Sequence, residues 1–155
     1  MASSFDTIGL QDSLSLPFPA ATKQVAGLVN GIQTDVMIMS FSDKIMVTIS
    51  QAGRLAHWLH IPMENQNPGT EGMHTLSEGD DALLPLKSLT TTTLLGGYSP
   101  GQDTTGQLLA RQIATAIAMK SPTEKRLLLV GLGLGTAATD RDSFFAIVDL
   151  VLQCL

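Results

Sequence analysis

The chain has 155 residues and a formal net charge of −5, with nine basic residues, and 15% of its residues are charged. This length suits one domain, and the acidic balance argues against a nucleic-acid partner, because phosphate binding requires clustered Lys and Arg. The apolar runs are much shorter than the roughly 20 residues of a membrane-spanning helix, so we expect no membrane partner.

The first eleven residues lack the basic and apolar regions of a signal peptide. Cys154, the single cysteine, excludes an internal disulfide and indicates a reducing compartment. We therefore expect a cytoplasmic protein, or one shared between cytoplasm and nucleus. The low content of charged residues is also a hint of a surface covered by a partner.

Residues 1–22, rich in Ser, Asp and Pro, are expected to form a flexible lead-in to a single domain, residues 23–155. Asn30-Gly31 is a turn signal between two strands, since both residue types accept positive φ. Alternating apolar residues and turn signals predict four strands, which are Gln24–Val29, Asp35–Phe41, Ile45–Gln51 and Arg54–Ile61.

Two turns fix a predicted register for the last three of these strands. A three-residue loop at Ser42–Lys44 and a turn at Gln51–Gly53 together create one continuous apolar face. That face would hold Met37, Met39, Phe41, Ile45, Val47, Ile49, Leu55, His57 and Leu59. The opposite face would be mixed, as where a second protein covers a sheet, and would hold Val36, Ile38, Ser40, Met46, Thr48, Ser50, Arg54, Ala56, Trp58 and His60.

Residues 62–86 show no periodicity and predict a long mobile loop. Four elements should follow: a Thr-rich strand, a helix ended by Ser121-Pro122, a central strand apolar on both faces, and a helix capped by Asp140 or Asp142. The strands are Leu89–Leu95 and Lys125–Leu134, and the first helix begins at Asp103 or Thr104. The fold class is therefore α+β: a mostly antiparallel sheet of about six strands with two helices on one face, the other face being available to a partner.

Motifs for enzymatic chemistry are weak. Gly131-Leu132-Gly133-Leu134-Gly135 follows a strand, but Thr136 stands where a dinucleotide fingerprint needs its third glycine. We expect these glycines instead to loosen the strand end and the turn into the last helix.

His57 and His60 lie three residues apart on a strand, so they point to opposite faces and cannot share a metal ion. We expect His57 to be buried and hydrogen-bonded and His60 to be exposed. No serine or cysteine has a base oriented by a third group. We therefore predict no enzyme, no catalytic residue, no cofactor and no metal. Trp58 is either an interface anchor or covered by the chain's own N-terminal segment, and both interpretations stay open.

Three blocks of the sequence resemble the proteasome assembly chaperone 3 family. The first is Lys23–Pro62, with the turn Ser40-Phe41-Ser42, and the second is Leu89–Gly97, which ends in Thr-Leu-Leu-Gly-Gly. The third runs from Gln107 to Cys154, and the three cover about two thirds of the chain. The N-terminal extension, the 62–86 loop and the Gly-rich segments 96–101 and 131–135 depart from the family pattern.

The resemblance implies a non-enzymatic chaperone that pairs with a related small chaperone of the chaperone 4 type. The pair would bind a proteasome α-type subunit, α5 in that family, guide assembly of the 20S α-ring, and then leave. We assign the chaperone–chaperone interface to Val36, Ile38, Met46, Thr48, Ala56 and Trp58, and the α-subunit contact to Ser42, Asp43, Lys44 and Tyr98. Two alternatives remain: a small dimerising scaffold of a trafficking or signalling complex, and a small nucleotide-binding enzyme built on the Gly-rich segment.

Overall fold

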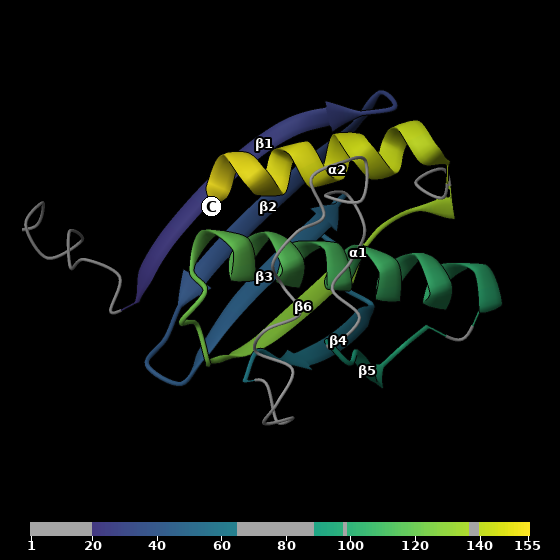
Figure 1. Ribbon diagram of the computed structural model, residues 1–155. Coiled ribbons are helices and arrows are strands. Elements are labelled where there is room, and N and C mark those ends of the chain that lie inside the picture. Colours follow the sequence, from purple (N-terminus) through teal and green to yellow (C-terminus); the bar gives the residue numbers. More distant parts are fainter. Residues whose placement is uncertain (1–19, 65–88, 98, 137–139) are drawn as a thin grey trace, which may run out of the picture.

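The computed structural model describes residues 20–64, 89–97, 99–136 and 140–155. A six-stranded sheet forms one layer, and both helices lie against one of its faces (Figure 1). This confirms the predicted α+β class. The strands are β1 (Ala21–Val29), β2 (Ile32–Ser40), β3 (Lys44–Gln51), β4 (His57–Pro62), β5 (Thr92–Leu95) and β6 (Leu127–Gly133), and the helices are α1 (Pro100–Lys120) and α2 (Arg141–Cys154).

The strands are arranged in the order β1-β2-β3-β6-β4-β5. β3 and β6 are parallel and the other neighbouring pairs are antiparallel. The predicted pairing of β3 with β4 is therefore wrong, because β6 lies between them. β6 is the most continuously apolar strand and lies at the centre of the sheet, where the helices cover one of its faces and Leu129 on the other face stays half-buried. Its central position was predicted correctly.

The predicted register between β2 and β3 is wrong by one residue. Ser40 pairs with Ile45, so the loop contains four residues, and Phe41 N–H donates to the Lys44 carbonyl across it at 2.9 Å. A shift of one residue turns every side chain of a strand to the other face. Val36 and Ile38 therefore lie in the core, 0% and 6% exposed, instead of on the open face.

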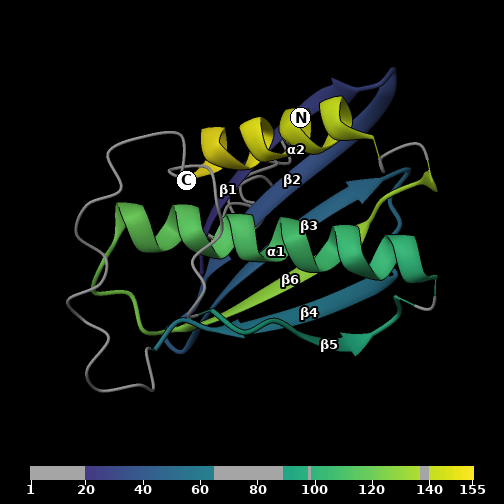
Figure 2. The same cartoon turned by 45° about the vertical axis from the view of Figure 1, so that its right-hand side comes forward.

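The core lies between the sheet and the two helices, which run side by side across it (Figure 2). β3 contributes Ile45, Val47 and Ile49, as predicted, and β4 contributes Leu59 and Ile61. The predicted apolar face also included four residues that lie outside the core: Met37 and Met39 are half-buried, and Phe41 and Leu55 are exposed. The helices add Leu109, Ile113 and Ile117 from α1 and Ile147, Val151 and Cys154 from α2.

The helix ends follow the sequence closely. α1 begins at Pro100 with Ser99 as its N-cap, about one turn before the predicted start, because proline suits the first helical position. It ends at Lys120, before Ser121-Pro122, as predicted. Asp140 caps α2 by accepting a hydrogen bond from the Ser143 amide at 3.1 Å, and this bond lowers the pKa of Asp140.

Two predicted segments fall largely outside the described residues, namely the lead-in 1–22 and the loop 62–86. Of the lead-in, Ala21 and Thr22 belong to β1. Of the loop, Pro62 ends β4 and Met63 is buried. The Thr-rich strand is shorter than predicted: Leu89 is buried, but β5 begins at Thr92.

The register can be tested with neighbouring residues of β2. Val36→Ala removes two methyl groups from the closed core and should lower the free energy of unfolding by about 2 kcal/mol. Met37→Ala, on the other face, should change it by less than about 1 kcal/mol. Urea unfolding of both variants measures this, and a larger loss for Met37→Ala would contradict the register.

Candidate partner interface

The middle of the sheet face opposite the helices holds two cross-strand rows of paired residues, flanked on the same side by rows that include Asp35 and Lys44. One row contains Gln24, Met37, Thr48, Gly131, Trp58 and Leu95, and the other contains Thr22, Met39, Met46, Leu129, His60 and Thr92. Directly paired residues point to the same side of a sheet. We call these twelve residues the open face, because no helix or strand of the described chain lies over them.

Trp58 stands on β4, the fifth of the six strands, and its ring reaches over Gly131 of the neighbouring inner strand β6. The two residues are cross-strand partners, and a Cβ on Gly131 would lie 2.8 Å from two atoms of the indole ring. The ring therefore covers the backbone of β6 where a side chain would otherwise stand. The prediction that this glycine loosens the strand end is therefore wrong. Gly131 lies within the strand and leaves space for the indole ring of Trp58.

Three of the six residues predicted for the chaperone interface lie on the open face: Met46, Thr48 and Trp58, all half-buried. Ala56 precedes β4 and is exposed at the end of the sheet. The assignment of Val36 and Ile38 to this interface is wrong, because the actual register of β2 with β3 places both side chains in the core. That Met46, Thr48, Ala56 and Trp58 contact a partner stays a prediction.

Sequence reasoning missed Met37, Met39, Leu129 and Leu95 as members of the open face. Periodicity alone does not separate Val36 and Ile38 from Met37 and Met39, because all four are apolar. One signal was available: β-branched residues suit a closely packed core, whereas methionine is flexible and frequent at adaptable binding surfaces. With three methionines, a tryptophan and two leucines among uncharged polar side chains, apart from His60, the open face suits a protein partner better than water.

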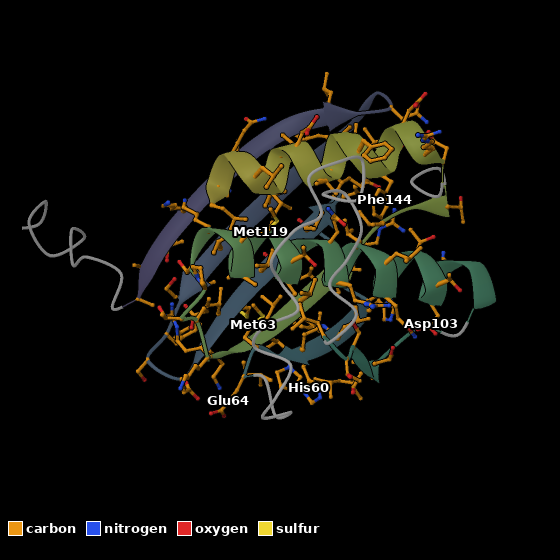
Figure 3. The ribbon with its side chains drawn as sticks, viewed as in Figure 1. His60, Met63, Glu64, Asp103, Met119 and Phe144 are labelled. Atoms are coloured by element: carbon orange, nitrogen blue, oxygen red, sulfur yellow. The ribbon has the colours of Figure 1, made fainter. Side chains whose placement is uncertain are left out.

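His57 belongs to a different part of the molecule, the helix side of β4 at the start of α1. It is buried, 8% exposed, as predicted, but the prediction that it is hydrogen-bonded is wrong for its Nε2 atom. Its Nε2 lies 3.4 Å from Asp103 Oδ1, close enough for electrostatic attraction but without hydrogen-bond geometry. Thr93 and Gln107 donate hydrogen bonds to the same carboxylate at 3.0 and 2.8 Å. Asp103 thereby joins β4, β5 and α1, and Figure 3 shows it in the first turns of α1.

Two glycines leave space for the His57 ring. A Cβ on Gly97 would lie 2.8 Å from Nε2, and one on Gly106 would lie 2.6 Å from Nδ1. A cleft of about 460 Å³ opens beside the ring, lined in part by Gly96, Gly97 and Gly133. These contacts give the glycine-rich segments a packing role. His60, which was predicted to be exposed, is half-buried and points to the opposite face from His57.

The buried imidazole has a consequence for stability. Burial lowers the pKa of His57 below its ordinary 6.5, and the attraction of Asp103 offsets only part of this. The unfolded chain therefore takes up this proton first as the pH falls. The contribution of neutral His57 to the free energy of unfolding is fully present above pH 6.5 and is progressively lost below it. Urea unfolding at about pH 7.5 and 5.5 should show this decline in the wild type and a smaller one in His57→Gln. Equal pH dependence in the two proteins would contradict the assignment to His57.

Three of the four residues predicted to contact an α-type subunit, Ser42, Asp43 and Lys44, lie together at one end of the sheet. Ser42 and Asp43 are exposed in the β2–β3 loop, with Lys44 Nζ 3.3 Å from Asp43 Oδ2. Lys44 pairs with Leu127, the first residue of β6, whereas Gly96 and Gly97 approach the far end of the sheet beside Ala56 and His57. The length of β6, about 20 Å, separates Lys44 from Gly96 and Gly97. Tyr98 lies outside the described residues.

Neither a metal centre nor a membrane helix is found in the described part of the chain. No group of three or more His, Cys, Asp or Glu side chains there is placed to hold a metal ion. No helix there is long and apolar enough to span a membrane.

Comparisons with known proteins were informative at the level of family and fold. The family model of proteasome assembly chaperone 3 matches residues 47–154, more than half of the chain. A structure described as a novel chaperone complex for yeast 20S proteasome assembly contains a similar chain, at a TM-score of 0.53 and 17% identity. The match covers 88% of this chain and 96% of that one. A search of curated proteins gave no match.

Proposed function

Because the chain belongs to the proteasome assembly chaperone 3 family, we propose that it is a non-enzymatic chaperone which pairs with a related small chaperone and binds a proteasome α-type subunit. The pair would guide assembly of the 20S α-ring and leave before the particle matures. The partner would be of the chaperone 4 type and the α-type subunit of the α5 type. The whole of residues 23–155 would act as one cytoplasmic domain.

The observation that carries this proposal is the open face. A sheet whose second side presents methionines, a tryptophan and leucines leaves apolar area in water unless another protein covers it. A related chaperone with the same fold could place its own open face against this one. Such an interface would bury on the order of 800 Å² per partner, the usual size for a specific complex.

The surface for the α-type subunit must be separate from the open face if both proteins bind at once. It must also release its subunit, so we expect a smaller and more polar contact than the chaperone–chaperone interface. The exposed loop Ser42–Lys44 at one end of the sheet fits this description.

Co-expression tests the proposal. The tagged chain is produced with small related chaperones and the seven α-type proteasome subunits, and mass spectrometry identifies what co-purifies. We expect one small chaperone and one α-type subunit. Recovery of neither, alongside a working positive control, would contradict the proposal and favour a dimerising scaffold of a trafficking or signalling complex.

A further inference from the structure

A second cleft lies on the helix side of the sheet, at the end where both helices stop. It has a volume of about 420 Å³ and is lined by the beginning of β1, the ends of β2, α1 and α2, and the turn before β6. Its apolar lining includes Ile38, Ile45, Ile117 and Cys154. A cleft of this size lies at the lower end of the range for small-molecule sites and suits one or two apolar side chains.

The rim of this cleft is basic. The Nζ atoms of Lys23 and Lys120 both donate to the backbone oxygen of Leu155, so two ammonium groups converge at its edge. Among the described residues, no carboxylate side chain forms an ion pair with Lys23, Lys120 or nearby Lys125.

Arg126, also at the rim, is already paired. Its Nη2 lies 2.7 Å from Glu124 Oε2, and its Nη1 donates to the Phe41 carbonyl at 2.8 Å. The hydrogen bond from Arg126 lowers the pKa of Glu124 to about 2, so this carboxylate stays ionised and bound to the arginine. Lys23 and Lys120 are held at the Leu155 oxygen but face no carboxylate side chain of the described residues, so with Lys125 they leave an excess of positive charge at this rim for a partner.

Charge is unevenly distributed along the strands. The end with the cleft carries Lys23, Lys44, Lys120, Lys125 and Arg126 against Asp43, Glu64 and Glu124. The other end carries Asp35, Asp103, Asp140 and Asp142 against Arg54 and Arg141, and Figure 3 shows Glu64 and Asp103 at the two ends. Helix dipoles account for Lys120 and for the acids at the helix starts, but not for Lys23 or Lys125, which lie outside both helices.

We infer that this cleft, which we call the basic cleft, docks an apolar side chain carried on an acidic segment of the proteasome subunit. This rests on the proposed function. The basic cleft opens on the helix side of the sheet, so a subunit bound there leaves the open face free for the second chaperone. The neighbouring loop Ser42–Lys44 would extend the contact. Lysines at the rim would accelerate association with an acidic segment, and that attraction weakens as salt is raised.

Charge reversal tests the inference. Lys23→Glu/Lys120→Glu is compared with Arg54→Glu/Arg141→Glu, which makes the same change in net charge at the other end. Each is co-expressed with the small chaperone and the α-type subunit that the wild type recovers. We expect the first pair to reduce recovery of the α-type subunit at least tenfold and to retain the small chaperone, and the second pair to retain both. Lys23→Gln/Lys120→Gln, which removes the charges without reversing them, should give an intermediate loss.

A photo-crosslinking amino acid at Ser121, an exposed residue of the cleft lining, gives an independent readout. The crosslinked peptide should come from the α-type subunit and contain an apolar residue flanked by Asp or Glu. Equal recovery of that subunit by the wild type and Lys23→Glu/Lys120→Glu would overturn the inference alone, as would a crosslink to residues 1–19 of the same chain. Failure of the wild type to recover any proteasome subunit would overturn the proposed function as well.

Discussion

Gly133→Ala should destabilise the fold by about 3 kcal/mol or more, the largest loss expected from a change this small. A Cβ on Gly133 would overlap the backbone carbonyl of Arg54 and approach the Leu55 amide within 3.0 Å. The chain crosses the end of β6 here on its way to β4, and the Ala56 amide donates to the Leu132 carbonyl at 2.9 Å. Neither backbone segment can move without breaking this pairing.

Thermal unfolding measures the effect, and a loss of this size corresponds to a drop of roughly 10 °C in Tm for a chain of this length. Gly101→Ala is the matched control. It lies in the first turn of α1, and a Cβ there would meet no atom of the described chain within 4 Å, so alanine should be neutral or slightly stabilising. Equal Tm values for the wild type and Gly133→Ala would show that residues 54–56 do not pack against β6 in solution.

Trp58→Ala should weaken binding of the second chaperone by about 2 kcal/mol or more, roughly 30-fold in Kd. The indole extends from β4 over the backbone of Gly131 on the inner strand β6, where a partner on the open face would bury it. Buried aromatic residues near the centre of an interface contribute most to its affinity. The same substitution should lower the free energy of unfolding of the isolated chain by much less than about 2 kcal/mol, because the indole is already partly exposed to water.

The control for Trp58→Ala is Leu152→Ala, which removes an exposed apolar side chain from α2 on the other side of the molecule. Titration calorimetry with the co-purified small chaperone compares the two variants with the wild type. We expect normal affinity for Leu152→Ala. If Trp58→Ala also bound normally while remaining folded, the open face would not be the chaperone–chaperone interface.

Much of the fold could be predicted from the sequence because the signals are local. Asn30-Gly31 takes positive φ in the β1–β2 turn, and Pro122 stands just beyond the end of α1, as predicted. The apolar alternation of β3 correctly placed Ile45, Val47 and Ile49 in the core. The continuous apolar run of β6 correctly indicated a central strand.

The candidate site was harder to predict because its members come from strands that are distant in the sequence. Trp58 meets Gly131 only because β6 returns to lie beside β4. Whether the loop after β2 has three or four residues decides which side of β2 is buried. Apolar residues alternate on both sides of β2, so the sequence pattern fits either register. The basic cleft combines β1, β2 and both helix ends, so no stretch of sequence contains it.

The sequence by itself therefore determined the order and type of the elements, the α+β class and the resemblance to the assembly chaperones. These depend on turn residues, helix caps and hydrophobic periodicity, which act between residues close together in the chain. The tertiary structure decided which strands are neighbours, which side of β2 is buried, and which charges share an end of the sheet. Those choices follow from packing between distant segments, where one more loop residue exchanges the core face for the face offered to a partner.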